Sequence, residues 1–326
     1  MRNIIKSILL ALILALFFSG CTGTSLYSTK ATTAPEETSA GTSAASQEST
    51  ARQEGTNAEI RLSGLLKAHF IDVGQADCIY IELPNEENML IDAGNNGDKN
   101  TILGYLDSNG VKKLDYVVGT HPHEDHIGSM DTVINNYDIG KIYMPKVSAN
   151  TKTFEDVLTA IQNKGLKVIA PESGSYLIDL RNRIDSSTVK DELVVQFIAP
   201  NSSSYKDVNN YSIVVKITFR NTSMLFMGDA EDVSEAEIIS VGYDVRSDLI
   251  KIGHHGSASS TTAGFLEDVQ PQYAVISVGK GNDYGHPAQS TLDKLNAAGV
   301  KVFRTDELGT ITATSDGEAI TMDKAK

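Results

Sequence analysis

Basic residues and cysteines are scarce in this chain of 326 residues. The 28 Lys and Arg residues stand against 42 Asp and Glu residues, so the formal net charge at pH 7 is −14. This balance argues against a protein that coats nucleic acid, because binding without sequence preference depends on Lys and Arg side chains that neutralise phosphates. The two cysteines exclude a disulfide framework of the kind that holds small secreted domains together.

The apolar run at the start of the chain is too short to cross a membrane. Ile8–Phe18 has about half of the ~20 apolar residues that a spanning helix needs. It follows the basic segment Met1–Lys6 and precedes Ser19-Gly20-Cys21, an order that resembles a bacterial lipoprotein signal. We therefore expect residues 1–20 to be a signal peptide and Cys21 to carry a lipid that anchors the protein to the outer face of the bacterial cell membrane. A short transmembrane anchor is the alternative.

Residues 21–57 are rich in Ser, Thr, Ala, Glu and Gln and have almost no large apolar side chains. Such a composition cannot bury enough surface to fold, so we expect a disordered tether. Apolar periodicity begins afterwards and predicts one folded domain over residues 58–326. Loss of residues 1–20 would take the net charge from −14 to −16. Cys78 would then have no partner, and its apolar neighbours predict a buried, inert thiol.

Three of the seven histidines lie in the stretch Thr120–Gly128. The preceding run Leu114–Gly119 is short, β-branched and apolar, which favours a buried parallel strand. In extended chain His121 and His123 point to the same side, and the turn into a helix directs Asp125 and His126 to a second point nearby. Imidazole and carboxylate groups in this spacing predict a cradle for two divalent cations. The alternative is a polar surface loop.

Two parts of the chain repeat one order of elements: an apolar hairpin, an acidic residue at a strand end, a helix, a strand and a histidine loop. Stacking two such halves, with the sheets face to face and the helices outside, would bring the histidine loops to one edge. The expected strands are residues 65–73, 77–83, 89–92, 114–119, 141–144, 166–169, 175–180, 192–198, 211–219, 223–227 and 248–252, and the expected helices are residues 100–108, 127–136, 153–163 and 233–239.

From about Leu65 onward the chain resembles the metallo-β-lactamase superfamily. The resemblance rests on Asp92 after a strand, on the pattern His121-x-His123-x-Asp125-His126, on Gly228-Asp229 and on a later histidine loop. Three further motifs resemble the extracytoplasmic hydrolase domain of ComEC-type competence proteins, namely His69–Asp77, Lys251–Ser257 and Tyr284–Pro287. The resemblance implies an α/β fold, a four-layer αββα sandwich.

The resemblance also implies a ligand set for two metal ions. His121 and His123 would bind one ion, Asp125 and His126 the other, and Asp229 would bridge them. His254 would complete the second position, with its neighbour His255 as the rival. Taken alone, Asp229 has a plainer interpretation as a strand-end turn residue.

One feature departs from the resemblance. Many members of the superfamily place another histidine on the first metal, whereas the corresponding segment here is Val208–Ser212, with Asn209 and Asn210. Because asparagine is a weak ligand, the first position would depend on two histidines, the bridging carboxylate and water. Imidazole and carboxylate ligands favour Zn²⁺, with Mn²⁺ as the second choice.

The expected reaction is hydrolysis through a metal-bridging hydroxide that Asp125 orients. His286 is a candidate proton donor to the leaving group or phosphate contact, or else a turn histidine. Backbone N–H groups of Gly256 and Ser257 are candidate phosphate donors. Asp92 is expected to orient a ligand, or else to be a turn carboxylate.

A phosphodiester is the expected substrate, either single-stranded nucleic acid or a phosphorylated envelope component. The acidic surface favours a small or flexible phosphodiester held mainly by metals, and duplex nucleic-acid binding is not expected. The alternatives are a β-lactamase-like amide or lactone hydrolase and a non-catalytic metal-binding lipoprotein in a DNA-uptake complex.

Overall fold

The computed structural model describes residues 62, 64–181 and 192–324. The expected signal peptide and the tether therefore lie outside the described residues. Within these ranges, no helix has both the length and the apolar character needed to cross a membrane.

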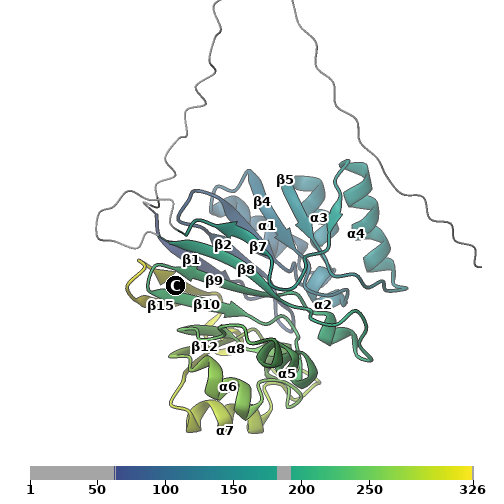
Figure 1. The fold of residues 1–326 in the computed structure, drawn as a ribbon. Coiled ribbons are helices and arrows are strands. Elements are labelled where there is room, and N and C mark those ends of the chain that lie inside the picture. Colours follow the sequence, from purple (N-terminus) through teal and green to yellow (C-terminus); the bar gives the residue numbers. More distant parts are fainter. Residues whose placement is uncertain (1–61, 63, 182–191, 325–326) are drawn as a thin grey trace, which may run out of the picture. The chain divides into compact units, whose positions relative to one another are not determined.

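Two mixed β-sheets form the centre of the domain (Figure 1). The first contains, in spatial order, β15 (Ile320–Lys324), β14 (Ile311–Ser315), β1 (Leu66–Phe70), β2 (Ile79–Glu82), β3 (Asn88–Ile91), β4 (Lys113–Val118), β5 (Asp138–Tyr143) and β6 (Val168–Ile169). The second contains β13 (Lys301–Arg304), β12 (Tyr273–Ile276), β11 (Leu249–Lys251), β10 (Thr222–Phe226), β9 (Val214–Phe219), β8 (Leu193–Ala199) and β7 (Tyr176–Asp179).

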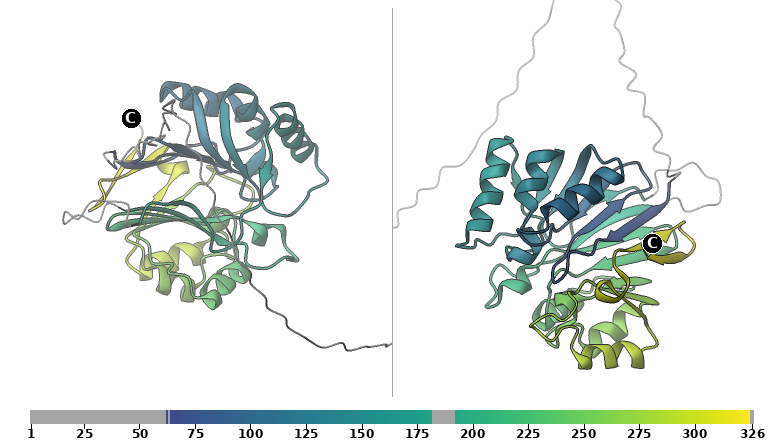
Figure 2. Two further views of the ribbon diagram at one scale, coloured as in Figure 1. Left: turned by 45° about the horizontal axis from the view of Figure 1, so that its top comes forward. Right: turned by 180° about the vertical axis from the view of Figure 1, so that it is seen from behind.

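Helices cover the outer face of each sheet, as the two views of Figure 2 show. On the first sheet lie α1 (Lys99–Ser108), α3 (Met130–Asn136) and α4 (Lys152–Asn163), preceded by the short α2 (Glu124–Ile127). On the second lie α5 (Asp232–Val241), α6 (Ala263–Val269) and α7 (Gln289–Ala297), followed by the short α8 (Thr305–Leu308). The fold is the expected four-layer αββα sandwich.

Strand alternation builds three hydrophobic layers from these elements. In β2, Ile79 and Ile81 point between the sheets, whereas Tyr80 points to the helices of the first sheet. Phe70 and Phe226 meet between the sheets with ring centroids 6.1 Å apart. The central strands β8, β9 and β11 are buried on both faces, so nearly all of their residues are shielded from solvent. Burial on both faces also explains the nearly continuous apolar runs that suggested buried strands in the sequence.

Several segments differ from the sequence prediction, and two of the differences lie beside the candidate ligands. The helix expected over residues 127–136 is divided into α2 and α3 around Gly128, where a Cβ atom would lie 2.2 Å from the backbone carbon of Asn95. The strand expected from Tyr211 begins only at Val214, because residues 208–211 form a 3-10 helix that buries Asn209.

The repeat of elements is real but the halves are interlocked. In both sheets an antiparallel hairpin is followed by parallel strands, β1 to β5 in one and β8 to β12 in the other. The last two strands, for which the sequence pattern carried no prediction, return to the first sheet, where β14 pairs with β1. The first sheet therefore contains chain from both ends of the domain, whereas the second is built from consecutive strands, β7 to β13.

Candidate metal centre

The candidate ligands, and Asp92 which is expected to orient one of them, follow the carboxyl ends of four strands. Asp92 follows β3, the His121 loop follows β4, Asp229 follows β10, and the histidine pair follows β11. Strands β3 and β4 are parallel neighbours, and so are β10 and β11. Parallel neighbours end at the same edge of a sheet, so the packing of two sheets brings residues from distant parts of the sequence to one place.

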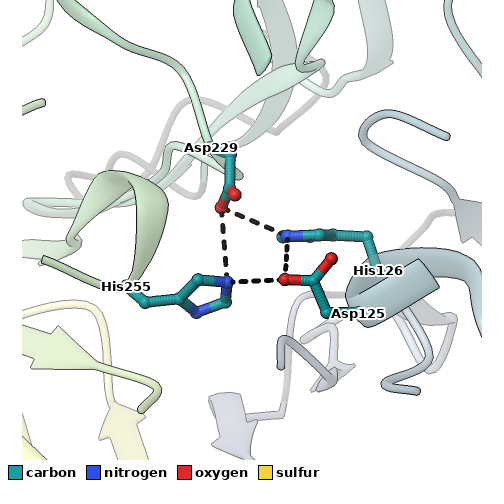
Figure 3. Close-up of side chains that lie close together, drawn as sticks. All are labelled: Asp125, His126, Asp229 and His255. Carbon is teal, nitrogen blue, oxygen red and sulfur yellow. Dashed lines mark hydrogen bonds and ion pairs between the residues drawn. The ribbon is translucent and has the colours of Figure 1, made fainter. Parts of the chain in front are cut away.

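Four side chains form the centre of the cluster (Figure 3). Asp229 Oδ1 lies 3.2 Å from His126 Nε2 and 3.7 Å from His255 Nε2. Asp125 Oδ2 lies 3.8 Å from His126 Nε2 and 3.3 Å from His255 Nε2. All four ligand atoms lie within 4.8 Å of one another, which is the size of a site for one metal ion.

The outer nitrogens of the two histidines are held by the protein. His126 Nδ1 lies 2.8 Å from Asp92 Oδ2, and His255 Nδ1 lies 2.9 Å from the carbonyl oxygen of Ser277. In a neutral imidazole, an Nδ1–H that donates to these oxygens leaves Nε2 with a lone pair directed at the cluster, which is the form that binds a metal ion. Asp92 is itself fixed by the N–H of Thr120, which donates to Oδ1 at 2.8 Å.

The residues present fit a divalent cation. His126 Nε2 and Asp229 Oδ1 are buried and make no hydrogen bond within the described residues. Buried polar atoms without partners are costly and rare in folded proteins. Two imidazoles and two carboxylates are the donor set of zinc, manganese or iron sites, so a cation would satisfy these atoms.

The charged groups of the cluster shift one another's pKa values. Burial disfavours a charged His126, but the surrounding carboxylates, chiefly Asp229, outweigh burial and raise its pKa well above the ordinary value. Burial also disfavours an ionised Asp229, but the imidazoles of His126 and His255 lower its pKa well below the usual range. Burial and the neighbouring His126 lower the pKa of His121. The carboxylate that would bridge the cations is therefore held ionised.

A second group of nitrogens surrounds the other oxygen of Asp229. His121 Nε2 lies 2.9 Å from His123 Nδ1 and 3.9 Å from Asp229 Oδ2. The structure thus places the first pair of histidines on one side of Asp229 and the pair His126 and His255 on the other. Of the two rivals for the second position, His255 is the one in the cluster with Asp125.

An open cavity of about 320 Å³ leads to the cluster. Its lining combines metal-ligand side chains with His286 and Tyr284, and the full set is Gln75, His123, Glu124, Asp125, Asn209, Asp229, His254, His255, Tyr284 and His286. The ring of His286 lies 5.3 Å from that of His254 and stacks on exposed Tyr284 at 5.8 Å.

The backbone N–H groups of Gly256 and Ser257 were predicted to contact a phosphate, but the Ser257 N–H is already used in a hydrogen bond within the protein. This N–H donates to the carbonyl oxygen of His254 at 2.7 Å, and the Ser257 hydroxyl pairs with Ser259 at 2.9 Å. Neither Gly256 nor Ser257 is among the residues that line the cavity. We correct this part of the prediction, because the turn that directs the histidines uses the Ser257 N–H itself.

Sequence reasoning missed a buried ion pair beneath the cluster. Lys251 Nζ lies 2.8 Å from Asp77 Oδ2, and both side chains are buried. Asp77 Oδ1 lies 3.6 Å from His255 Nδ1, and the Asp77 N–H donates to the carbonyl oxygen of Asp125. A lysine in an apolar strand just before the histidine pair was the available signal.

Comparison with known proteins places the chain in a family. Residues 71–280 match the model of the metallo-beta-lactamase superfamily. ComE operon protein 3 of Bacillus subtilis is 30% identical over 268 residues, which are 77% of this chain and 33% of that protein. Competence protein ComA of Neisseria gonorrhoeae is 28% identical over 242 residues, covering 74% of this chain and 31% of that protein. The chain spans about a third of the length of these curated relatives.

Among solved structures, the metallo hydrolase Igni18 of Ignicoccus hospitalis is 18% identical with a TM-score of 0.49, covering 81% of this chain and all of that one. The metallo-beta-lactamase fold protein YhfI of Bacillus subtilis is 11% identical with a TM-score of 0.49, covering 80% of this chain and all of that one. From the family match, the sheet topology and the ligand cluster together, the chain belongs to the metallo-β-lactamase superfamily of metallo-hydrolases.

Proposed function

We propose that the protein hydrolyses phosphodiester bonds with the help of two divalent cations. The observation that carries the proposal is the lining of the cavity, which holds four histidines and three carboxylates and includes no Lys or Arg among the described residues. An anionic phosphodiester can approach such a surface only if bound cations supply the positive charge. A site with open positions for substrate is typical of catalytic rather than structural metal centres.

The cations would be held by the groups on the two sides of Asp229. Asp125, His126, Asp229 and His255 would hold one, and His121 and His123 would contribute to the other, with Zn²⁺ favoured over Mn²⁺. When bound, the cations would supply a deprotonated water at neutral pH and draw charge from the phosphoryl oxygens. Asp125, whose side chain is about one-third exposed at the cavity, would orient the attacking water through a carboxylate oxygen.

His286 would supply a proton to the leaving oxygen. Gln75 Oε1 accepts from the N–H of Gly279 at 3.0 Å, which turns the amide Nε2 of Gln75 toward His286 Nδ1 at 3.5 Å. In the neutral ring an Nδ1 that accepts this contact leaves the proton on Nε2. That N–H is then the donor available to a leaving group in the cavity.

The proposal is tested by comparing four substrates under one Zn²⁺ or Mn²⁺ condition: bis(4-nitrophenyl) phosphate, single-stranded DNA, duplex DNA and a chromogenic β-lactam. We expect turnover of the aryl phosphodiester and loss of that turnover in His126→Ala. Turnover of the lactam alone would reject the phosphodiester assignment. Duplex cleavage faster than that of both other phosphodiesters would reject the electrostatic reasoning from the acidic composition.

We also propose that the domain works outside the cytoplasm on a lipid at Cys21. The support is the order of basic, apolar and small residues before that cysteine, together with relatives whose names refer to competence. Those names make single-stranded nucleic acid during DNA uptake one natural substrate. Expression of the full chain should give a membrane-bound product, and Cys21→Ala should release it. A variant that stays on the membrane would favour the transmembrane anchor.

A further inference from the structure

The two oxygens of Asp229 face two different pairs of imidazoles. Oδ1 lies 3.2 Å from Nε2 of His126 and 3.7 Å from Nε2 of His255. Oδ2 lies 3.9 Å from Nε2 of His121 and 3.8 Å from Nε2 of His254. The arrangement is nearly symmetric, because the distance from His254 Nε2 to Oδ2 is almost the same as that from His255 Nε2 to Oδ1.

The adjacent histidines reach opposite sides of Asp229 because of their backbone. Both have positive φ angles, 47° for His254 and 51° for His255, and their rings are inclined at 68°. The left-handed backbone conformation is strained for residues other than glycine. Residues that adopt it cluster at functional sites. In this turn the left-handed conformation of both residues directs one imidazole toward each oxygen of Asp229.

A buried carboxylate holds His254 in this position. Glu231 Oε1 lies 3.0 Å from His254 Nδ1, and only 9% of Glu231 is exposed. Ser259 donates its hydroxyl to the same oxygen at 2.7 Å. With Nδ1–H directed at Glu231, His254 presents the lone pair of Nε2 toward Asp229, the same division of roles that Asp92 enforces on His126.

Asn209 gives a second, independent sign of a ligand here. Its side chain is 5% exposed and lines the cavity, and its Oδ1 has no hydrogen-bond partner among the described residues. Its Nδ2 lies 3.3 Å from His254 Nδ1 and 3.4 Å from Glu231 Oε1. A buried amide oxygen without a protein partner is suited to accept from a water or to face a cation at this end of the cavity.

We propose that His254, oriented by Glu231, is the protein ligand that completes the first cation position together with His121, His123 and Asp229. This inference rests on the two-cation centre of the proposed function. The two histidines of one turn then serve different cations, and the first position does not need a histidine in segment 208–212. Glu231 is a positioning residue, because it acts through His254.

The test measures bound metal rather than activity. Wild-type protein and variants are loaded with Zn²⁺, dialysed and analysed for metal per chain, and Co²⁺ is titrated with its visible absorption as the readout. We expect two ions in the wild type and one in His254→Ala. Glu231→Gln should bind the first ion about 10- to 100-fold more weakly. His286→Ala, in the same cavity, is the matched control and should bind two.

Each other outcome overturns the assignment. His254→Ala with two ions at wild-type affinity would exclude His254 as a ligand, and loss of both ions together would exclude separate positions. A wild type with one ion would refute the completed first position, whereas a wild type with none would refute the proposed function as well. Thermal melting of each metal-free variant confirms folding, and Glu231→Gln keeps the test valid should His254→Ala not fold.

Discussion

Replacing Asp92 by asparagine should weaken cation binding about 10- to 100-fold without changing the fold, the usual effect of losing a group that orients a metal ligand. Asp92 Oδ2 lies 2.8 Å from His126 Nδ1 and accepts the Thr120 hydroxyl at 2.7 Å. The Asn amide can keep the bond from the Thr120 N–H to one oxygen, but it then presents N–H₂ to His126 Nδ1. His126 Nδ1 must then accept this hydrogen bond, so the proton of the neutral ring moves to Nε2. The Nε2 lone pair that faces Asp229 is thereby lost.

The size of the effect follows from linkage. A cation at 100 times its dissociation constant stabilises the folded protein by about 2.7 kcal/mol. An affinity that is tenfold lower reduces this to about 1.4 kcal/mol, and one that is a hundredfold lower to about 0.4 kcal/mol, at the same cation concentration. For a domain of this size such differences shift the melting temperature by several degrees, at about 2–4 °C per kcal/mol.

The assay is calorimetric titration of the metal-free protein, combined with melting curves at equal cation concentration. Asp115→Asn is the matched control, because it makes the same chemical change at a carboxylate on β4 that contacts no candidate ligand. This carboxylate accepts hydrogen bonds from Lys113 and from the Asn88 N–H. Each variant is compared with its own metal-free form, so any change in intrinsic stability cancels. Equal affinity and an equal rise in melting temperature for Asp92→Asn and wild type would refute the orienting role of Asp92.

Three further predictions follow from the same contacts. Asp229→Asn should fold, as judged by circular dichroism, but lose most turnover, because a neutral amide cannot bridge two cations; near wild-type turnover with full metal content would contradict the bridging role. Lys251→Met should lower the free energy of unfolding by about 3–5 kcal/mol in denaturant titrations, because Asp77 is left buried without its partner; the double variant with Asp77→Leu should recover part of this loss, and no recovery would argue against the ion pair. Limited proteolysis should leave a stable fragment that begins near residue 58, and a stable core that begins well after residue 90 would place the domain boundary elsewhere.

The sequence by itself determined the order of most elements up to about residue 252 and the chemistry of the ligands. Strands such as Leu114–Gly119 are encoded locally, because an apolar run bounded by glycine has few other structures in which its side chains are buried. The histidines and Asp125 lie within one short segment, so their grouping did not depend on distant contacts. Asp92 and Asp229 were found because each ends a strand before a helix, and the repeated order made them equivalent.

Only the tertiary structure decided how distant segments meet around these ligands. Two adjacent imidazoles have the same local chemistry, and the turn that separates them has left-handed φ/ψ angles at both His254 and His255. The partners of these histidines, Glu231 and the Ser277 carbonyl, come from other loops. Likewise β14 reaches β1 across more than two hundred residues. Such pairings depend on which buried surfaces fit together, and no local pattern of side chains records that.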